Sequence, residues 1–162
     1  PVVAAVNGYA LGAGAEMAVA CDFIVMADEA QIGFPETSIG TCVGGGVSKI
    51  LPQLVGLSQA RRLLYVGDKI NGQEAQRIGL ALAVYPADDL LEQAHGLGVR
   101  LASQAPVSIA MLKRLVNQGG ANDFDSHLQQ ELDAVFTCST TQDWQEGVDA
   151  FAQKRQPQFK GR

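Results

Sequence analysis

The sequence predicts an α/β fold in which strands and helices alternate in the first half and helices fill the second half. Two short runs, Val2–Val6 and Asp22–Ala27, are rich in β-branched and other apolar residues, which is typical of buried strands. Glycines follow the first run and precede residues with helical spacing. From Asp88 onward the apolar residues keep a helical spacing almost to the end of the chain. Together these observations predict strand–helix units followed by a helical tail.

The first strand, over Val2–Val6, is expected to end at the turn Asn7-Gly8. Gly12-Ala13-Gly14 then predicts a tight approach to a helix that begins near Ala15. The strand at Asp22–Ala27 follows that helix. After it we expect a short strand over 31–34, a loop over 35–43, and a helix that opens at Gly44 and carries Val47, Ile50, Leu51 and Leu54.

Residues that favour helix ends predict the remaining elements. Ser58 and Asn71 are expected to start helices that run through Leu64 and Ile78, because their short polar side chains accept hydrogen bonds from free amides. Gly79 predicts the end of the second of these helices. A short strand over 82–85 and four helices complete the chain, the helices at 88–103, 106–117, 123–138 and 141–153 with breaks at Pro106, Gly119-Gly120 and Thr140-Thr141. The chain therefore divides into a strand–helix part, 1–87, and a helical part, 88–162.

Composition excludes several classes of function. The 162 residues have a formal net charge of −5, so the chain has no basic surface for nucleic acid. No apolar run approaches the about 18 residues that a membrane span needs. No basic segment with a cleavage site predicts a secretory signal. A cytoplasmic protein, or one of an organelle matrix such as the mitochondrial matrix, fits best.

Three cysteines, Cys21, Cys42 and Cys138, are odd in number and widely spaced. They form no zinc spacing and no Cys-x-x-Cys pair, so we expect buried thiols in a reducing compartment and no metal site. The apolar run begins at Pro1 without a preceding Met, so the chain is expected to start inside a fold.

Two glutamates beside glycine-rich backbone are the candidates for chemistry. Glu16 follows Gly12-Ala13-Gly14 in an apolar stretch, so a helix would place its carboxylate in the first turn and partly inside the protein. Glu36 follows Pro35 and precedes the triplet Gly44-Gly45-Gly46. Free backbone amides next to carboxylates can bind an oxyanion and carry a proton in one place. The pattern indicates an active site.

Other motifs fit less well. Gly12-x-Gly14 lacks the third glycine of a dinucleotide-binding loop, because position 17 is Met17. No P-loop sequence and no Gly-x-Ser-x-Gly nucleophile motif occurs. The two histidines, His95 and His127, both lie in the helical part and are expected to serve packing or the surface.

Four stretches carry a more specific pattern. They are Pro1–Glu16 with Cys21-Asp22; Phe34-Pro35-Glu36 with Gly40; Leu64-Tyr65-Val66-Gly67 with Ala75 and Gly79-Leu80; and Glu146–Phe151 with Lys154-Arg155. In these stretches, and over essentially its whole length, the chain resembles the crotonase, or enoyl-CoA hydratase/isomerase, superfamily. The resemblance implies a ClpP/crotonase-like fold of stacked ββα units followed by trimerisation helices. Residues 1–87 would be the C-terminal part of the core and 88–162 the trimerisation region, with the N-terminal portion of family members not in this sequence.

The resemblance also implies the reaction, which is reversible addition of water to a 2-enoyl-CoA by a lyase of fatty acid metabolism. The backbone N–H of Ala13 matches one half of the oxyanion hole, next to Gly12 in the substrate site; the other amide would come from the N-terminal portion. Glu16 would orient and deprotonate water, and Glu36 would deliver a proton to the α-carbon. The implied enzyme needs no cofactor, since coenzyme A is part of the substrate.

Further substrate contacts follow from the same resemblance. Gly44 matches a helix N-terminus that lies against the acyl-thioester group, and Phe151 and Lys154 on the last helix match candidates for contacts to coenzyme A. The implied assembly is a homotrimer or hexamer.

Two alternatives to the hydratase stay open. Because family isomerases commonly keep only the second glutamate, the presence of both favours hydration over isomerisation or other thioester enolate chemistry. The run Cys42–Ser48 differs from the form common in simple hydratases, so the acyl group is left open. A catalytically silent fragment or scaffold subunit is the alternative from a different class.

Overall fold

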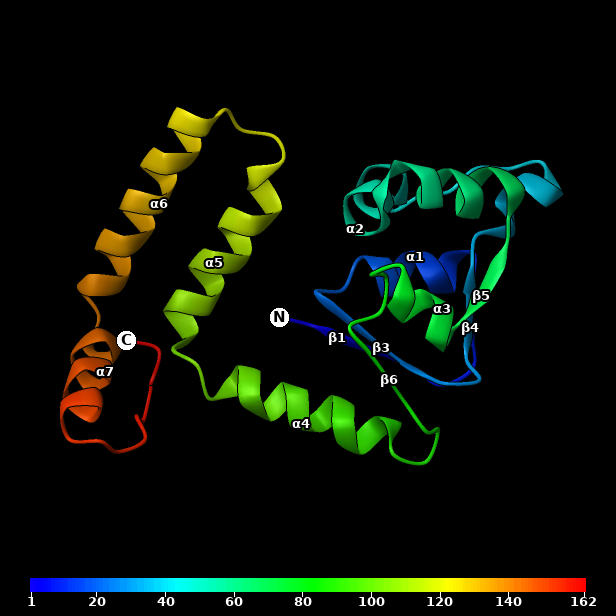
Figure 1. The fold of residues 1–162 in the computed structure, drawn as a ribbon. Coiled ribbons are helices and arrows are strands. Elements are labelled where there is room, and N and C mark those ends of the chain that lie inside the picture. Colours follow the sequence, from blue (N-terminus) through cyan, green and yellow to red (C-terminus); the bar gives the residue numbers. More distant parts are fainter. The chain divides into compact units, whose positions relative to one another are not determined.

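The computed structural model describes all 162 residues, which form two compact units, Val2–Leu97 and Gly98–Arg162 together with Pro1 (Figure 1). The division lies inside helix α4 (Leu90–Ala102). Each unit has its own architecture: the first combines sheets with helices, and the second is helical.

One three-stranded parallel sheet in the first unit has the order β1-β3-β6. It consists of β1 (Val3–Val6), β3 (Phe23–Ala27) and β6 (Ala83–Tyr85). The central strand is buried from Ile24 to Ala27, as expected for a parallel strand covered on both faces. The strands predicted over 2–6, 22–27 and 82–85 are therefore confirmed.

A second three-stranded sheet has the order β2-β4-β5. Here β4 (Gln31–Gly33) pairs in parallel with β2 (Tyr9–Leu11) and antiparallel with β5 (Lys69–Asn71). The sequence prediction included β4 but missed β2 and β5. Each is three residues long, which is too short to show the alternation of apolar and polar residues that identifies a strand.

The order strand, strand, helix occurs twice along the chain, and each such ββα unit adds one strand to each sheet. The first ββα unit consists of β1, β2 and α1, and the second consists of β3, β4 and the helical segments that follow. The helical elements of this part of the chain are α1 (Ala13–Val19), the 3₁₀ helix η1 (Pro35–Ile39), α2 (Val47–Arg61), the π-helix η2 (Arg62–Val66) and α3 (Gly72–Arg77). This arrangement agrees with stacked ββα units.

A core of apolar side chains joins the two sheets to the helices that cover them. The largest fully buried side chains come from strands, from η2, α2 and α4, and from the residue that precedes η1: Val25, Met26, Ile32, Phe34, Val47, Leu51, Leu63 and Leu90. Burial of each such side chain stabilises the fold by about 1.5–3 kcal/mol.

Three boundaries between positions 35 and 64 differ from the prediction. The loop predicted over 35–43 contains η1, which begins at Pro35 because proline fits the first helical position. The helix predicted from Gly44 begins only at Val47. The break expected at Ser58 lies at Gly56, whose φ of 75° and ψ of 158° are open to glycine, and Ser58 makes no capping hydrogen bond.

The cap predicted at Asn71 is confirmed. Its Oδ1 accepts a hydrogen bond of 2.9 Å from the N–H of Glu74. Gly79, with φ of 84°, follows the last turn of α3, and the N–H of Leu80 donates to the carbonyl of Ala75 at 2.8 Å. This is the hydrogen-bond pattern that ends many helices at a glycine.

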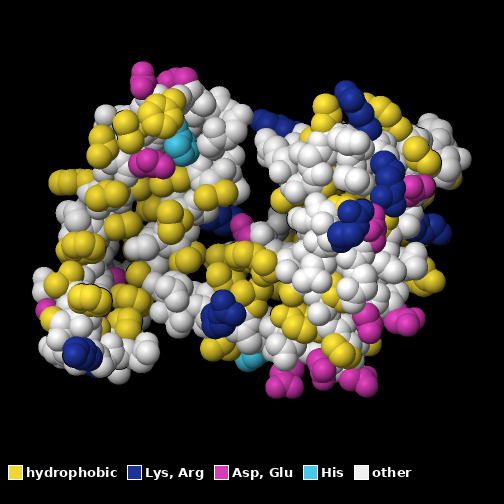
Figure 2. Space-filling model, viewed as in Figure 1, with side chains coloured by type: hydrophobic (Ala, Val, Ile, Leu, Met, Phe, Trp, Pro, Cys, Tyr) yellow, Lys and Arg dark blue, Asp and Glu magenta, His cyan; other side chains and the backbone are white.

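The second unit contains the end of α4, then α5 (Pro106–Gly119), α6 (Phe124–Ser139) and α7 (Gln142–Ala152), close to the ranges predicted. Helices α5 and α6 lie side by side (Figure 1). Asp123 and Thr141 cap α6 and α7 by accepting hydrogen bonds from the N–H groups three residues on. Figure 2 shows many hydrophobic side chains on the surface of these helices.

The segment after α7 folds back onto the start of that helix. Asp143, only 3% exposed, accepts hydrogen bonds of 2.7 and 2.8 Å from the N–H groups of Lys160 and Gly161. Glu146 accepts hydrogen bonds from the Arg155 guanidinium at 2.6 and 2.8 Å. It also accepts one from the N–H of Gln158. The buried Asp143 and the partly buried Glu146, both paired in this way, hold the segment in place.

We expect Glu146 to make stability depend on acidity. The Arg155 guanidinium and then the Gln158 amide lower the pKa of the Glu146 carboxyl from 4.5 to about 2. A carboxyl with a lowered pKa in the folded state stabilises the fold fully above about pH 4.5, and this contribution is lost as the pH falls towards 2. Glu146→Gln should therefore lower the melting temperature at pH 7, and its difference from wild type should shrink between pH 4.5 and 2. Glu92→Gln, at an exposed carboxylate on α4, is the control; an equal effect there would contradict this account.

Candidate active site

Glu16 lies on the first turns of α1 and is half-buried. Its Oε1 accepts a hydrogen bond of 2.6 Å from the N–H of Gly44, a residue 28 positions later in the chain. A hydrogen bond from an amide to a charged carboxylate is short and stronger than a neutral one. The fold therefore holds this carboxylate in one position.

Glu36, on η1, is one of two buried acidic residues in the chain, at 8% exposure. Its Oε2 is buried and has no hydrogen-bond partner. Its Oε1 lies 3.1 Å from the position that a Cβ on Gly12 would occupy. Since buried polar atoms are nearly always paired in proteins, an unpaired one at this place indicates a group that is kept for a ligand or a reaction.

Backbone hydrogen bonds bring the two glutamates to the same helix start. The N–H of Gly12 donates to the carbonyl of Gly33 at 3.1 Å, at the ends of the paired strands β2 and β4. The N–H of Glu16 donates to the carbonyl of Gly12 at 2.9 Å. Glu36 thus lies against the residue before α1, and Glu16 is one turn further on.

The start of α1 also supplies a donor for an anion. Ala13 is the first residue of the helix and is exposed, and an amide at this position has no acceptor within its own helix. The helix dipole adds positive potential there. Gly12 makes this start possible, because its φ of 55° and ψ of −124° are accessible to glycine and costly for other residues. One helix start therefore combines an exposed backbone N–H with two carboxylates.

Gly44 and Gly45 lie against Glu16, which the sequence did not predict. Gly44 is not the start of a helix, because α2 begins three residues later, and its N–H is engaged by Glu16. A Cβ on Gly45 would lie 3.7 Å from Cβ of Glu16. The glycine triplet was the signal available in the sequence, but its partner lies too far away in the chain to be inferred from spacing.

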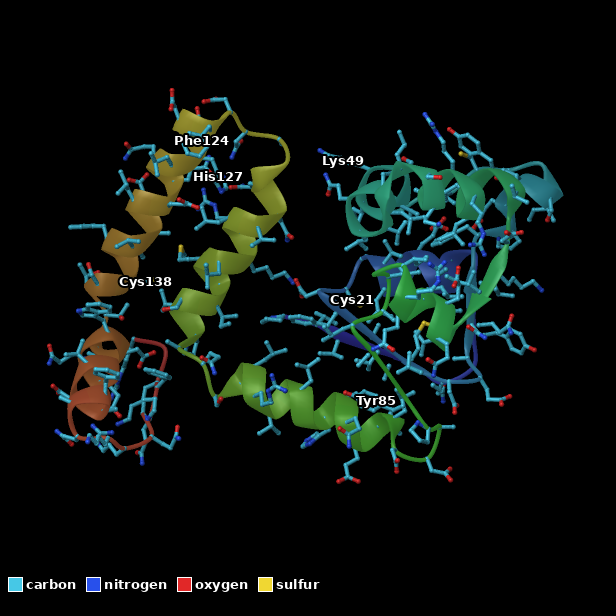
Figure 3. The ribbon with its side chains drawn as sticks, in the orientation of Figure 1. Cys21, Lys49, Tyr85, Phe124, His127 and Cys138 are labelled. Carbon is cyan, nitrogen blue, oxygen red and sulfur yellow. The ribbon has the colours of Figure 1, made fainter.

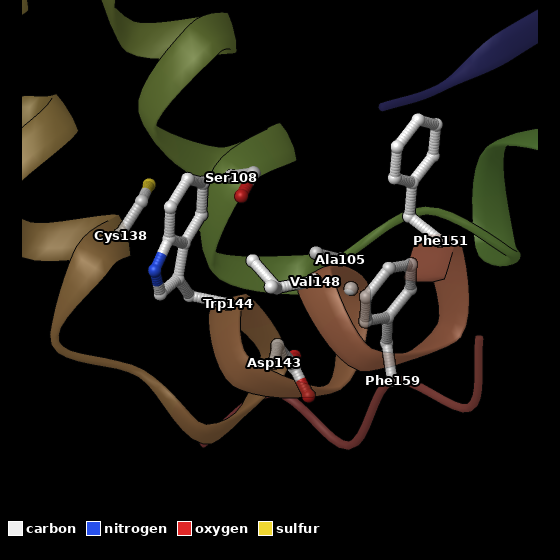
Figure 4. A pocket seen from close by; sticks show the side chains of 9 residues that line it. Ala105, Ser108, Cys138, Asp143, Trp144, Val148, Phe151 and Phe159 are labelled. Carbon is white, nitrogen blue, oxygen red and sulfur yellow. The ribbon is translucent and has the colours of Figure 1, made fainter. Parts of the chain in front are cut away.

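Phe151 and Lys154 lie in the second unit; Phe151 is in the last turn of α7, whereas Lys154, predicted on the same helix, follows its C-cap residue Gln153. Phe151 is 87% exposed and lines a mostly apolar pocket of about 340 Å³ with Trp144, Val148 and Phe159 (Figure 4). Lys154 has a φ of 54° and is the one residue other than glycine in the left-handed region. Both remain candidates for substrate contacts.

The cysteines and histidines form no site. All three cysteines are free, but the expectation that they are buried is wrong: Cys42 is exposed, and Cys21 and Cys138 are only partly buried (Figure 3). His127 on α6 lies 3.7 Å from the carboxylate of Glu131 and packs against Gly119. No group of three or more possible ligands could hold a metal ion. None of the helices is both long and apolar enough to cross a membrane.

Comparison with known proteins identifies the family of the chain. A family model described as "Enoyl-CoA hydratase/isomerase" matches residues 1–162. The chain is 42% identical over 159 residues to a crotonyl-CoA hydratase of Syntrophomonas wolfei, and 40% identical over 162 residues to a 2,3-dehydroadipyl-CoA hydratase of Escherichia coli. These matches cover 98% and 100% of this chain but 61% and 64% of the relatives.

A solved structure gives the same result. The crystal structure of an enoyl-CoA hydratase from Bacillus anthracis superposes with a TM-score of 0.96 at 38% identity, covering 100% of this chain and 63% of that one. The chain therefore spans less than two thirds of the length of these relatives.

Proposed function

The chain belongs to the enoyl-CoA hydratase/isomerase family, and on this premise we propose that its protein adds water reversibly to a 2-enoyl-CoA thioester. The observation that carries the proposal is the pair of carboxylates at one helix start: Glu16 held by an amide, and Glu36 buried with one oxygen unpaired. The hydratases among the similar proteins support the same reaction.

In the proposed reaction the carboxylate of Glu16 takes a proton from water as the water oxygen bonds to the β-carbon. The electron pair of the double bond moves towards the thioester and leaves negative charge on its oxygen. Protonated Glu36 then gives its proton to the α-carbon, and the enolate collapses to the 3-hydroxyacyl thioester. The proton on Glu16 returns to Glu36 through solvent, so the net change is the addition of one water molecule. General acid–base steps of this kind contribute about 10²–10⁴-fold each.

The N–H of Ala13 is the proposed donor to the thioester oxygen, with Gly12 setting its direction. A backbone donor of this kind contributes about 10²–10³-fold, because it points at the charge that develops in the transition state. The exposed position of Ala13 at the start of α1 supports this role.

Several further features belong to the proposal. Coenzyme A is bound as part of the substrate, no separate cofactor takes part, and Phe151 and Lys154 contact the coenzyme. The helical part, 88–162, forms a homotrimer or hexamer, which the exposed apolar side chains of α5 to α7 support. The compartment is the cytoplasm or the mitochondrial matrix, where free cysteines such as the three found here remain reduced.

The test is an assay of the natural gene product with crotonyl-CoA, following loss of the absorbance of the conjugated thioester. Hydration to 3-hydroxybutanoyl-CoA supports the proposal. Conversion of a 3-enoyl-CoA to the 2-enoyl isomer without hydration would replace it by the isomerase alternative. Binding of neither thioester would favour the silent scaffold.

We expect Lys154→Gly to separate stability from substrate binding. A non-glycine residue in the left-handed region costs about 1–2 kcal/mol, so glycine should raise the free energy of unfolding by about 0.5–1 kcal/mol net. Loss of the ammonium group should raise KM for the coenzyme A thioester several-fold and leave kcat unchanged. Thermal unfolding and initial rates measure the two effects.

Lys154→Gln is the matched control, because it removes the charge and keeps the left-handed backbone. It should raise KM without a gain in stability. An unchanged KM in both variants would show that Lys154 does not contact the coenzyme.

A further inference from the structure

The hydrogen bond from Gly44 to Glu16 links the proposed water-activating carboxylate to a rigid turn. The carbonyl of Gly44 accepts from the N–H of Val47, the first residue of α2, at 3.1 Å. Gly45 and Gly46 have φ of 58° and 82°, so the turn depends on glycine at both places. The start of α2 therefore holds the backbone of Gly44 in place through its carbonyl.

Close packing reinforces this link. A Cβ added to Gly44 would lie 3.4 Å from Oε2 of Glu16, which is an ordinary van der Waals distance. Oε1 of the same carboxylate takes the hydrogen bond at 2.6 Å. The two oxygens of the Glu16 carboxylate therefore differ: Oε1 accepts the hydrogen bond from the Gly44 N–H, whereas Oε2 lies beside Gly44 without that bond.

We propose that the N–H of Gly44 is a positioning group for Glu16, holding Oε1 so that Oε2 is presented to the attacking water. The inference rests on the proposed hydration, and it assigns Gly44 to the carboxylate rather than to the acyl-thioester group. Positioning matters because a displacement of about 1 Å at a reacting group can lower the rate a hundredfold.

The test removes the amide and keeps the rest of the site. Gly44→Pro deletes the N–H, whereas Gly44→Ala keeps it and adds a methyl group at a tolerated distance. We expect Gly44→Pro to lower kcat for crotonyl-CoA hydration by about tenfold to a hundredfold, the size of a lost hydrogen bond to a charged group, with KM nearly unchanged. Gly44→Ala should stay within about threefold of wild type, since no hydrogen bond is lost.

A second reaction distinguishes positioning of Glu16 from a general disturbance. Exchange of the α-protons of butanoyl-CoA with deuterium from solvent needs Glu36 and the oxyanion donor but no attack by water. Gly44→Pro should leave this exchange at the wild-type rate. Combined with Glu16→Ala, it should cause no further loss of hydration, because both changes remove the same function.

Each other outcome overturns the inference. Equal losses of hydration and exchange would show a disturbed site, and a raised KM with unchanged kcat would show that the amide binds substrate. Full hydration by Gly44→Pro would show that the hydrogen bond is not needed. If Gly44→Pro does not fold by circular dichroism, glycolic acid at position 44 replaces the N–H with an ester oxygen, and the same outcomes apply. A wild-type protein without hydration would instead refute the proposed function.

Discussion

Glu36→Gln is expected to lower kcat for hydration of a 2-enoyl-CoA by about 10²–10⁴-fold, because the amide cannot give a proton to the α-carbon. Glutamine has nearly the same shape, and Oε2 of Glu36 has no hydrogen-bond partner to lose. We therefore expect the melting temperature and KM to change little. Initial rates with crotonyl-CoA and thermal unfolding measure these quantities.

A comparison with Glu16→Gln assigns the two roles. Glu16→Gln should also abolish hydration, because glutamine cannot take a proton from water. Only Glu36→Gln should stop the deuterium exchange of butanoyl-CoA at its α-carbon. Glu29→Gln, at an exposed carboxylate outside the site, is the control and should keep full activity. Near wild-type hydration in both site variants would refute the assignment of the glutamates.

Gly12→Ala is expected to have the second large effect, on stability and activity together. Its backbone angles, φ of 55° and ψ of −124°, would strain any residue with a Cβ. The added Cβ would also lie 3.1 Å from Oε1 of Glu36, so the carboxylate or the start of α1 must shift. We expect a loss of about 1–3 kcal/mol in the free energy of unfolding and, through the misplaced Ala13 amide, of about 10²–10³-fold in kcat.

Gly14→Ala is the matched control, two residues further along the same helix. No atom lies within 4 Å of a Cβ at Gly14, and its φ is not positive. Alanine inside a helix is more favourable than glycine, so this variant should be as stable as wild type or more stable, by up to about 1 kcal/mol. Activity should be unchanged. Equal losses in Gly12→Ala and Gly14→Ala would contradict the special role of Gly12.

Helix starts and ends were predictable where the signals are local. Asn71 caps α3, as predicted. The helices predicted over 123–138 and 141–153 are α6 and α7, and their first predicted residues, Asp123 and Thr141, cap them. A side chain that bonds an amide three residues later depends on little beyond its own segment. The short strands β2 and β5 were not predictable, because three residues carry no period and are held by their partners in the sheet.

The candidate site was predictable as a set of residue types, and its connections were not. The glycines near Glu16 and Glu36 in the sequence indicated that free backbone amides lie close to the two carboxylates. Nothing local indicated that Glu36 would be buried against Gly12. The sequence also predicted a helix start at Gly44, where the structure has a turn whose amide binds Glu16.

The sequence by itself determined that the chain has an α/β part and a helical part, that its formal net charge is −5, and which two glutamates are the candidates for the proposed chemistry. These conclusions depend on composition, periodicity and short motifs, which are properties of neighbouring residues. Only the tertiary structure decided that Oε1 of Glu16 is tied to Gly44 while Oε2 of Glu36 is buried and unpaired. Such contacts join positions 24 to 28 residues apart, and packing of strands and helices, rather than local preference, brings them together.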